Sequence, residues 1–229
     1  VSVEEKMGLF SDLDKTVSAP EEVGVSVPYR VFQLIETTTE KNFVNSEGTI
    51  LSNKIPRVLF LGLLTGQEAN RGTEQDSIEK AESRGWEAMK EWNLMDHVKE
   101  RAKILGKILK TAEEAPKERM DLILGNQVVG IMVHESTGHP YEADRILGRE
   151  AAQAGESFVT RDMLGKRIGA EVVSVVDDPT LKNSYGYYLY DDEGVPARRR
   201  FLMKNGIINE FLHNRETAAE MVFSRNASA

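Results

Sequence analysis

The sequence predicts an α+β fold in two parts. The first part is an antiparallel β-meander with two long helices, and the second is an α+β part with a buried, motif-bearing helix and β-hairpins. Three observations lead to this prediction. Apolar and polar residues alternate before residue 66, apolar residues recur every three or four positions between residues 73 and 109, and Asn205-Gly206 separates two apolar runs as a hairpin turn does.

The first part begins with a polar stretch, residues 1–27, which predicts a short helix and a loop. Alternation predicts a strand that starts at Tyr29, and Asn45-Ser46-Glu47-Gly48 has the composition of a turn. Residues 49–52 are expected to pair back, and a further strand is expected over residues 56–64. These segments form a meander of about three strands.

Two helices are expected next, because apolar residues share one helix side in residues 73–92 and again in residues 94–109. In the second helix the repeating positions are Val98, Ala102, Leu105, Ile108 and Leu109. The polar stretch at residues 111–119 contains Pro116 and is the expected domain boundary.

The second part opens with an expected short strand over residues 120–124. A long helix over residues 127–148 follows, and its first residues are apolar on most sides, which predicts burial. The remaining expectations are a loop or short helix at 151–158, a helical turn at 161–167, strands at 171–176 and 185–190, a hairpin of 198–204 with 207–213, and a last helix capped by Asn214.

The composition of the chain argues against several classes of partner and location. The 229 residues are 40% hydrophobic and 29% charged, which is ordinary for a soluble globular protein. A net charge of −8 does not indicate a nucleic-acid or anionic-membrane partner, and no apolar run approaches the ~20 residues of a membrane span. The chain has no cysteine, which excludes a disulfide framework, and its polar start shows no signal peptide. We therefore expect a cytoplasmic protein without nucleic-acid or membrane partners.

The strongest chemical signal is the stretch His134-Glu135-Ser136-Thr137-Gly138-His139. It holds two of the four histidines of the chain, with carboxylates at Glu135, Glu142 and Asp144. Imidazole nitrogens and carboxylates are ligands that zinc prefers, and a carboxylate beside the metal can act as a general base. The stretch is therefore a candidate zinc and proton-transfer site.

The spacing of the two histidines requires a distortion. Five positions separate them by about 140° on a regular α-helix, which would leave His134 apart from Glu135 and His139. A π-type turn brings positions i and i+5 into line, and Pro140 and Gly138 both loosen a helix. We therefore expect a distorted turn between the histidines.

Two histidines on one helix are often solvent-exposed or satisfied by ordinary hydrogen bonds. Here the apolar lead-in predicts a buried helix, and buried His and Glu side chains need partners. This favours a metal or catalytic site.

These residues also carry a family resemblance. HESTGHPYEADR resembles the H-E-x-x-x-H-x-x-E-x-D signature of the TldD/PmbA family of metallopeptidases, also described as modulators of DNA gyrase. Three further stretches agree with the family in order and spacing, at residues 45–49, 175–178 and 191–196. The intact signature is similar to the catalytic TldD branch, because the PmbA branch lacks it.

The resemblance implies a zinc-dependent peptidase that acts on peptides or unfolded segments, with peptide-precursor maturation as one use. It implies that His134 and His139 bind Zn²⁺ and that Glu135 is the catalytic base. Glu142 or Asp144 would hold a ligand imidazole or act as a ligand. The family encloses its active site in a dimer, so a homodimer or a heterodimer with a related subunit is expected.

The resemblance also implies that the chain is an internal fragment. Residues 1–112 would be the C-terminal portion of an N-terminal α+β domain, and residues 113–229 the first portion of a C-terminal metallopeptidase domain. The resemblance implies that the third zinc ligand is a cysteine near the C-terminus of the full-length protein, and this chain has no cysteine. The fragment alone is therefore expected to be inactive.

Other polar groups are weaker candidates. Asp177-Asp178 and Asp191-Asp192-Glu193 could bind a cation, but such groups more often accept hydrogen bonds from their own turn. Arg198-Arg199-Arg200 could clamp a carboxylate, although strand alternation would split the three between two faces. His213 ends a hairpin strand and is expected to be structural.

The alternative to a peptidase is a non-catalytic subunit or assembly half of a TldD/PmbA-type complex, in which the histidine helix is structural. Imidazoles that are engaged by carbonyls or carboxylates, with no approach for water, would favour that alternative.

Overall fold

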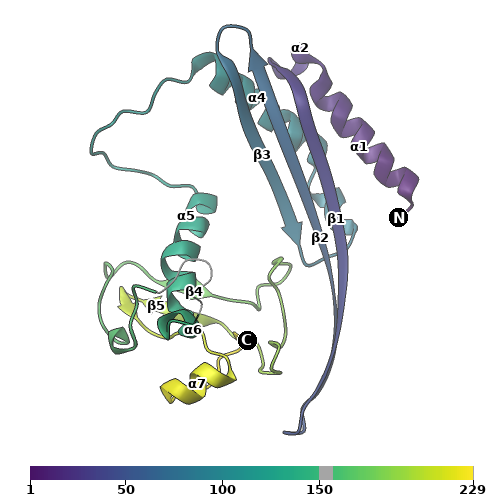
Figure 1. Cartoon of the computed structure of the whole chain (residues 1–229). Helices are drawn as coiled ribbons and strands as arrows, with labels where there is room; N and C mark the ends of the chain where they lie inside the picture. Colours follow the sequence, from purple (N-terminus) through teal and green to yellow (C-terminus); the bar gives the residue numbers. More distant parts are fainter. Residues whose placement is uncertain (150–156, 229) are drawn as a thin grey trace. The chain divides into compact units, whose positions relative to one another are not determined.

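The computed structural model describes residues 1–149 and 157–228. The chain forms two compact units, and each is described by itself (Figure 1). Unit 1 comprises Val1–Lys41, Asn53–Glu118 and Asn183–Tyr185, and unit 2 comprises Asn42–Ser52, Arg119–Lys182 and Gly186–Ala229. The tip of the first hairpin therefore belongs to unit 2.

Unit 1 combines long strands with helices. In order, the elements are α1 (Val3–Ser18), α2 (Pro20–Val23), β1 (Ser26–Val44), β2 (Ile50–Glu68), β3 (Gly72–Glu82), α3 (Glu87–Glu91) and α4 (Leu94–Thr111). A capping box starts α1, because the Ser2 side chain accepts from the Glu5 backbone and the Glu5 side chain accepts from the Ser2 backbone. At 16 residues, α1 is longer than the short helix expected from the polar sequence.

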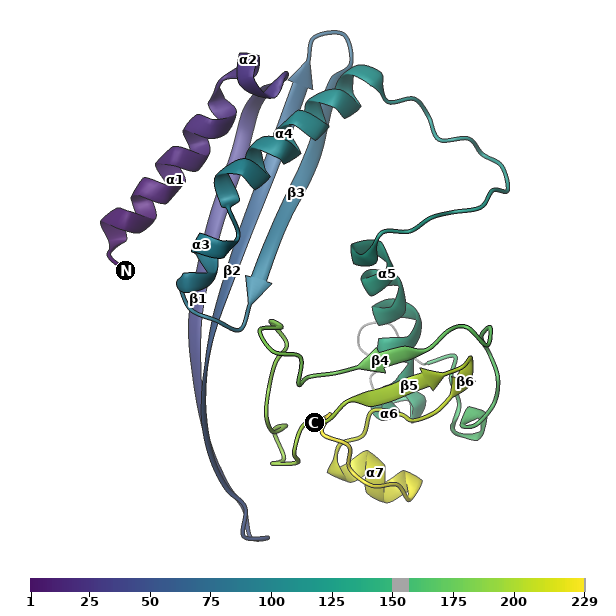
Figure 2. The same ribbon diagram turned by 180° about the vertical axis from the view of Figure 1, so that it is seen from behind.

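The sheet of unit 1 has the order β1-β2-β3, with β2 and β3 antiparallel. Val58, Phe60 and Leu64 alternate along β2 and are fully buried. α4 covers this face in Figure 2 and buries Val98, Ala102, Leu105 and Leu109 against it, which confirms the predicted second helix; Ile108 is exposed. A Cβ at Gly66 would lie 2.9 Å from Leu109 Cδ1, so the close approach of α4 to β2 requires glycine there.

The prediction of a helix over residues 73–92 is wrong. β3 occupies Gly72–Glu82 and pairs without interruption with β2, from Glu68↔Gly72 to Val58↔Glu82. Only the short helix α3 follows. The apolar spacing around Ile78 and Ala81 fits a helix locally, but eleven consecutive strand partners in β2 decide the conformation.

Unit 2 contains short elements around a small sheet. They are α5 (Asn126–Val133), η1 (His134–Gly138), η2 (His139–Tyr141), α6 (Ala143–Ile146), η3 (Arg161–Met163), β4 (Val175–Asp177), β5 (Arg200–Lys204), β6 (Ile207–Ile208) and α7 (Arg215–Met221). The sheet order is β4-β5-β6, and both strand pairs are antiparallel. Its core includes Tyr141, Leu202, Ile208, Phe211 and Met221.

Several predictions from local chemistry are confirmed in unit 2. Asn205 and Gly206 form the β5–β6 turn with φ of 51° and 75°. Asn214 caps α7, since its side chain accepts from the Thr217 backbone. The turn at Asn45 also forms, because Asn45 Oδ1 accepts from the backbone N–H of Glu47 and of Thr49 at 3.0 Å each.

Three predictions for the second part are wrong. Residues 120–124 and 185–190 form no named strand; only Tyr190 makes an isolated bridge, to Pro196. The helix expected over residues 127–148 is broken into four segments, and it is not buried: Val128, Val129, Ile131 and Met132 are each at least 40% exposed. The described residues provide neither a partner strand nor a cover for these side chains. The segment expected at 151–158 lies mostly outside the described residues.

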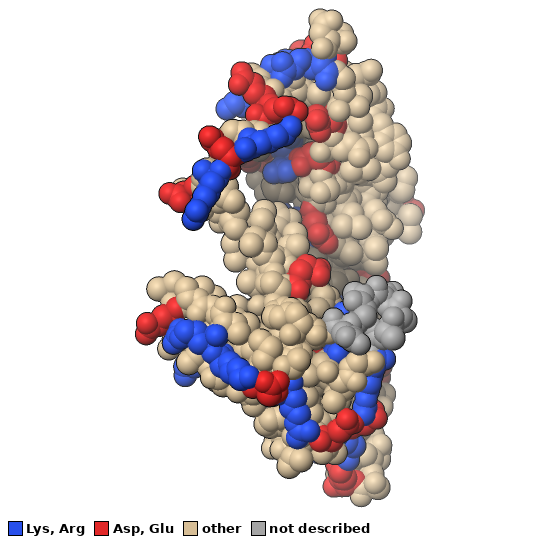
Figure 3. Space-filling view, turned by 60° about the vertical axis from the view of Figure 1, so that its left-hand side comes forward, with Lys and Arg blue, Asp and Glu red and all other residues tan. Residues whose placement is uncertain are grey.

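The surface carries both signs of charge in close proximity. In Figure 3, Lys and Arg lie interspersed with Asp and Glu on the visible face. Ion pairs such as Arg84–Glu91 (2.6 Å) and Lys99–Glu22 (2.5 Å) join some of these charges. Among the described residues, no helix is both long and apolar enough to cross a membrane.

Candidate metal centre

The candidate site is built on a π-helical turn. α5 changes at His134 into η1, a π-helix that spans His134–Gly138. The backbone N–H of His139 donates to the carbonyl of His134, five residues earlier. This confirms the expected distortion, which turns the two histidines toward the same side.

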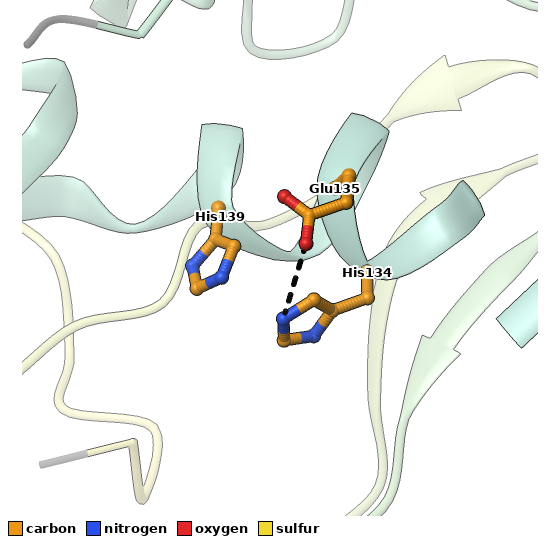
Figure 4. A group of neighbouring side chains, drawn as sticks. All are labelled: His134, Glu135 and His139. Carbon is orange, nitrogen blue, oxygen red and sulfur yellow. Dashed lines mark ion pairs between the residues drawn. The ribbon is translucent and has the colours of Figure 1, made fainter. Parts of the chain in front are cut away.

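The two imidazoles lie next to each other. Their ring centroids are 4.3 Å apart at an angle of 70°. His134, Glu135 and His139 each offer one ligand atom, and these three atoms all lie within 4.8 Å of one another (Figure 4). Nε2 of His134 lies 3.8 Å from Oε1 of Glu135. The side chain of His134 is 61% exposed and that of His139 is 34% exposed, so water reaches both rings.

Glu142 orients His139. Its Oε1 lies 2.8 Å from His139 Nδ1, and its Oε2 accepts from Arg145 Nε. The 3₁₀ turn η2 brings Glu142 under His139, since the Glu142 N–H donates to the His139 carbonyl. With Nδ1 engaged by the carboxylate, Nε2 of His139 is the nitrogen left for a metal.

Asp144 lies elsewhere. Its Oδ1 accepts from the backbone N–H of Arg145, and its side chain lines a different cavity, with Asn214 and Thr217. Of the two carboxylates that sequence reasoning left open, the structure brings only Glu142 to a histidine.

A cavity of about 330 Å³ lies beside the histidines within unit 2. His134, His139, Glu142 and Asp177 supply its charged and titratable groups. Its apolar wall comes from α5, β4, β5 and the segment after β6, namely Val133, Val175, Val176, Leu202 and Leu212. The site therefore has an open depression with both polar and apolar walls, in which a small part of a ligand can lie.

Tyr141, the last residue of η2, anchors the histidine-bearing segment in the core of unit 2. It is fully buried, and its ring packs edge-on against Phe211 with centroids 6.2 Å apart. Burial raises the pKa of the Tyr141 phenol to about 12, so the side chain is neutral at all physiological pH values. Backbone bonds between Tyr141, Ala143 and Leu212 fix the same segment to the chain after β6.

The weaker candidates are engaged in local structure. Asp178 Oδ1 accepts from the backbone and hydroxyl of Thr180, and Asp191 Oδ1 accepts from the N–H groups of Glu193 and Val195. These are turn contacts, as expected. The three arginines separate: Arg198 pairs with Glu210, Arg199 with Asp178 and Arg200 with Asp177. His213 is buried, and its Nδ1 lies 3.3 Å from Thr217 Oγ1.

Sequence reasoning did not foresee the arginines that hold the carboxylates of this cavity. Arg145 binds Glu142, and buried Arg200 binds Asp177. The i,i+3 spacing of Glu142 and Arg145 could have indicated the first pair. No local signal indicates the second, because 23 residues separate its members.

The donor set fits zinc. Two imidazoles with an adjacent carboxylate are zinc ligands of the usual kind, and a carboxylate behind one imidazole is the usual outer support. His134 and His139 would hold the ion.

The comparisons with known proteins cover both units. Residues 1–117 match the family model described as PmbA/TldA metallopeptidase central domain, and residues 117–229 match the PmbA/TldA metallopeptidase C-terminal domain. A metalloprotease of Methanocaldococcus jannaschii is 33% identical over 223 residues, which are 96% of this chain and 46% of that protein. A zinc metalloprotease TldD homolog of Saccharolobus solfataricus is 37% identical over 99 residues, covering 43% of this chain and 20% of that protein.

Solved structures share the fold. A candidate modulator of DNA gyrase from Thermotoga maritima superposes with a TM-score of 0.68 at 19% identity, over 100% of this chain and 49% of that one. TldE from Thermococcus kodakarensis gives a TM-score of 0.64 at 17% identity, over 96% and 46%. The chain spans about half the length of the curated relatives with which it aligns over nearly its whole length. The two family models together cover all 229 residues, and the chain belongs to the PmbA/TldD family of metallopeptidases.

Proposed function

We propose that the chain carries the zinc-binding and general-base residues of a peptidase that hydrolyses peptides or unfolded segments. The observation that carries the proposal is the π-helical turn η1, which gathers ligand atoms of His134, Glu135 and His139 within 4.8 Å. A bound zinc ion would polarise the scissile carbonyl and a water molecule. A third protein ligand would lie outside these 229 residues.

Each residue then has one role. His134 and His139 hold the ion, and Glu142 keeps the His139 ring in place through Nδ1. Glu135, whose carboxylate is exposed beside the rings, takes a proton from water and passes it to the leaving amine. The apolar wall of the 330 Å³ cavity would receive a substrate side chain.

The exposure of both rings supports this proposal over a non-catalytic subunit. Among the ring nitrogens of the two histidines, only Nδ1 of His139 has a carboxylate of the described residues within hydrogen-bonding distance, and water reaches both imidazoles. A purely structural histidine pair would have its nitrogens enclosed. From the resemblance to TldD-type enzymes we further propose peptide-precursor maturation as one use of the activity. We also propose that the partner is a second copy of the protein or a related subunit. We also propose a cytoplasmic location, which the absence of cysteine supports.

The substitution Glu135→Gln tests the role of the base. It keeps the shape of the side chain but removes the proton acceptor, so peptide hydrolysis by the full-length protein should fall by about 10²- to 10⁴-fold. Zinc content, measured by elemental analysis, should not change, because the histidines are intact. The matched control is Glu118→Gln, an exposed carboxylate far along the chain from the motif.

Cleavage by the Glu135→Gln protein at the wild-type rate would remove Glu135 from the mechanism. If the variant lost zinc together with activity, the result would instead indicate that Glu135 is a zinc ligand.

A further inference from the structure

A second carboxylate faces the cavity of the histidines. Asp177 ends β4 and lines the cavity together with His134, Gly138 and His139. Its side chain is 40% exposed, and the mechanism above gives it no role. The question is what an aspartate at this place contributes.

Glu142 shows how a carboxylate of this cavity supports a ligand. One oxygen, Oε2, is held by Arg145, and the other, Oε1, is 2.8 Å from Nδ1 of His139. The arginine fixes the carboxylate, and the carboxylate fixes the ring.

Asp177 has the contact with an arginine that Glu142 has, but not the contact with a histidine. Its Oδ2 accepts from Nε of Arg200 at 2.9 Å and also from Nη2 of the same guanidinium. In the part of the chain that the structure describes, Oδ1 of Asp177 has no hydrogen-bond partner. One oxygen is therefore anchored, and the other has no hydrogen bond to the described residues, in a side chain that lines the cavity.

Arg200 makes this anchor rigid. Its residue is 2% exposed, and Nη1 donates to the carbonyls of Asn226 and Ala227 while Nη2 also contacts the Tyr188 hydroxyl. A buried guanidinium with this many acceptors cannot move without leaving charge unpaired. Asp177 is thus presented to the cavity in a fixed position.

His134 lacks the support that His139 has. Its only contact with a carboxylate among the described residues is that of Nε2 with Glu135, at 3.8 Å. Nδ1 has no hydrogen-bond partner there, and it lies 3.9 Å from the point where a Cβ of residue 138 would be. Because residue 138 is glycine and lines the cavity, the Nδ1 side of the ring remains open to it.

We propose that Asp177 is the positioning residue for His134, with Oδ1 accepting a hydrogen bond from the Nδ1–H of that ring when Nε2 binds the metal. The inference rests on the proposed zinc function. No hydrogen bond joins the two side chains among the described residues, so forming it requires a change in the position of the His134 ring, whose side chain is 61% exposed. Each ligand histidine then has one carboxylate, and each carboxylate has one arginine.

The physical effect is on the imidazole. A carboxylate that accepts from Nδ1–H selects the tautomer with its lone pair on Nε2, fixes the plane of the ring and makes the ligand nitrogen more basic. Loss of such a support typically weakens metal binding by about 10- to 100-fold.

A zinc titration of matched variants tests the proposal. Calorimetry on the full-length wild type and on its Asp177→Asn variant should give a Kd about 10- to 100-fold higher for the variant. The control is Asp178→Asn, which removes the same charge from the adjacent residue. Asp178 pairs with Arg199 and its own turn and does not line the cavity, so the Kd should match that of the wild type.

A second measurement needs no variant and therefore does not depend on the folding of Asp177→Asn. Histidine side-chain ¹⁵N spectra of the zinc-loaded wild-type chain should show His134 protonated at Nδ1 with a slowly exchanging, low-field proton. Metal coordination through Nδ1 of His134 would overturn the proposal. Equal zinc affinity of Asp177→Asn and Asp178→Asn, both folded by circular dichroism, would also overturn it. Absence of zinc binding by the full-length wild type would contradict the proposed function itself.

Discussion

His213 is a buried imidazole outside the candidate metal centre. It is 3% exposed and lies between the rings of Phe211 and Phe223, with centroid distances of 6.3 and 5.3 Å. Burial lowers its pKa from the ordinary value of 6.5, although the nearby Glu210 carboxylate opposes this shift. The folded state therefore binds fewer protons than the unfolded state at mildly acidic pH, and stability falls as the pH falls through 6.5.

The substitution His213→Asn should reduce this pH dependence. Asparagine can keep the contact with Thr217 but does not titrate, so the free energy of unfolding of the variant should change less between pH 7.5 and 5 than that of the wild type. Urea unfolding at a series of pH values measures the difference. Carboxylates titrate mostly below this window. If wild type and variant lose stability in parallel, the acid sensitivity originates at another group.

At the scale of elements, the β5–β6 turn depends on one glycine. Gly206 has a φ of 75°, and a Cβ there would lie 2.2 Å from the Gly169 carbonyl oxygen and 2.6 Å from that of Ala170. Both obstacles are backbone atoms, so a side chain can be accommodated only if the chain moves. Gly165 has a similar φ of 82°, but nothing lies within 4 Å of its Cβ position.

These two glycines give a matched pair of alanine variants. Gly165→Ala should cost about 1 kcal/mol, the strain of a left-handed alanine. Gly206→Ala adds steric overlap to the same strain and should cost about 3 kcal/mol or more. Chemical unfolding measures both. Equal losses of stability would show that the close approach of residues 169 and 170 is not rigid.

Elements set by local chemistry could be predicted from the sequence, whereas those set by distant partners could not. The turns at Asn45 and at Asn205-Gly206, the Asn214 cap and the π-helical turn η1 all depend on residues within a few positions. β3 depends on β2 instead, and its apolar spacing alone indicated a helix. The strand expected at residues 120–124 needs a pairing edge, and no described residue supplies one.

In the candidate site, too, features set by nearby residues could be predicted from the sequence, and contacts with distant residues could not. The histidine pair, Glu135 and the two possible supporting carboxylates were identified from their spacing. The choice of Glu142 follows from the 3₁₀ turn η2, which places it under His139. The contact of Asp177 with Arg200 joins β4 to β5, so it depends on sheet pairing that no short sequence window contains.

At the scale of the molecule, unit 2 is assembled from distant parts of the sequence. The hairpin tip at Asn42–Ser52 belongs to it, and Glu47 in that tip accepts from both Nη atoms of Arg215, at 2.6 and 3.1 Å. Arg215 also donates its backbone N–H to Glu193. Two stretches that resemble the family, residues 45–49 and 191–196, therefore meet on one arginine.

The family models divide the chain at residue 117, within the exposed stretch of residues 112–119. The assignment of residues 1–112 and 113–229 to an N-terminal and a metallopeptidase domain remains a proposal. The proposed zinc ligands and the proposed base, His134, His139 and Glu135, all lie in the second half of the chain.

The central claim is that His134 and His139 bind zinc, and equilibrium zinc content tests it most directly. The full-length protein, dialysed against a saturating concentration of free zinc, should contain one zinc ion per chain by elemental analysis, and its double variant His134→Ala/His139→Ala should contain none. A full-length wild type without zinc, or a double variant with as much zinc as the wild type, would contradict the account.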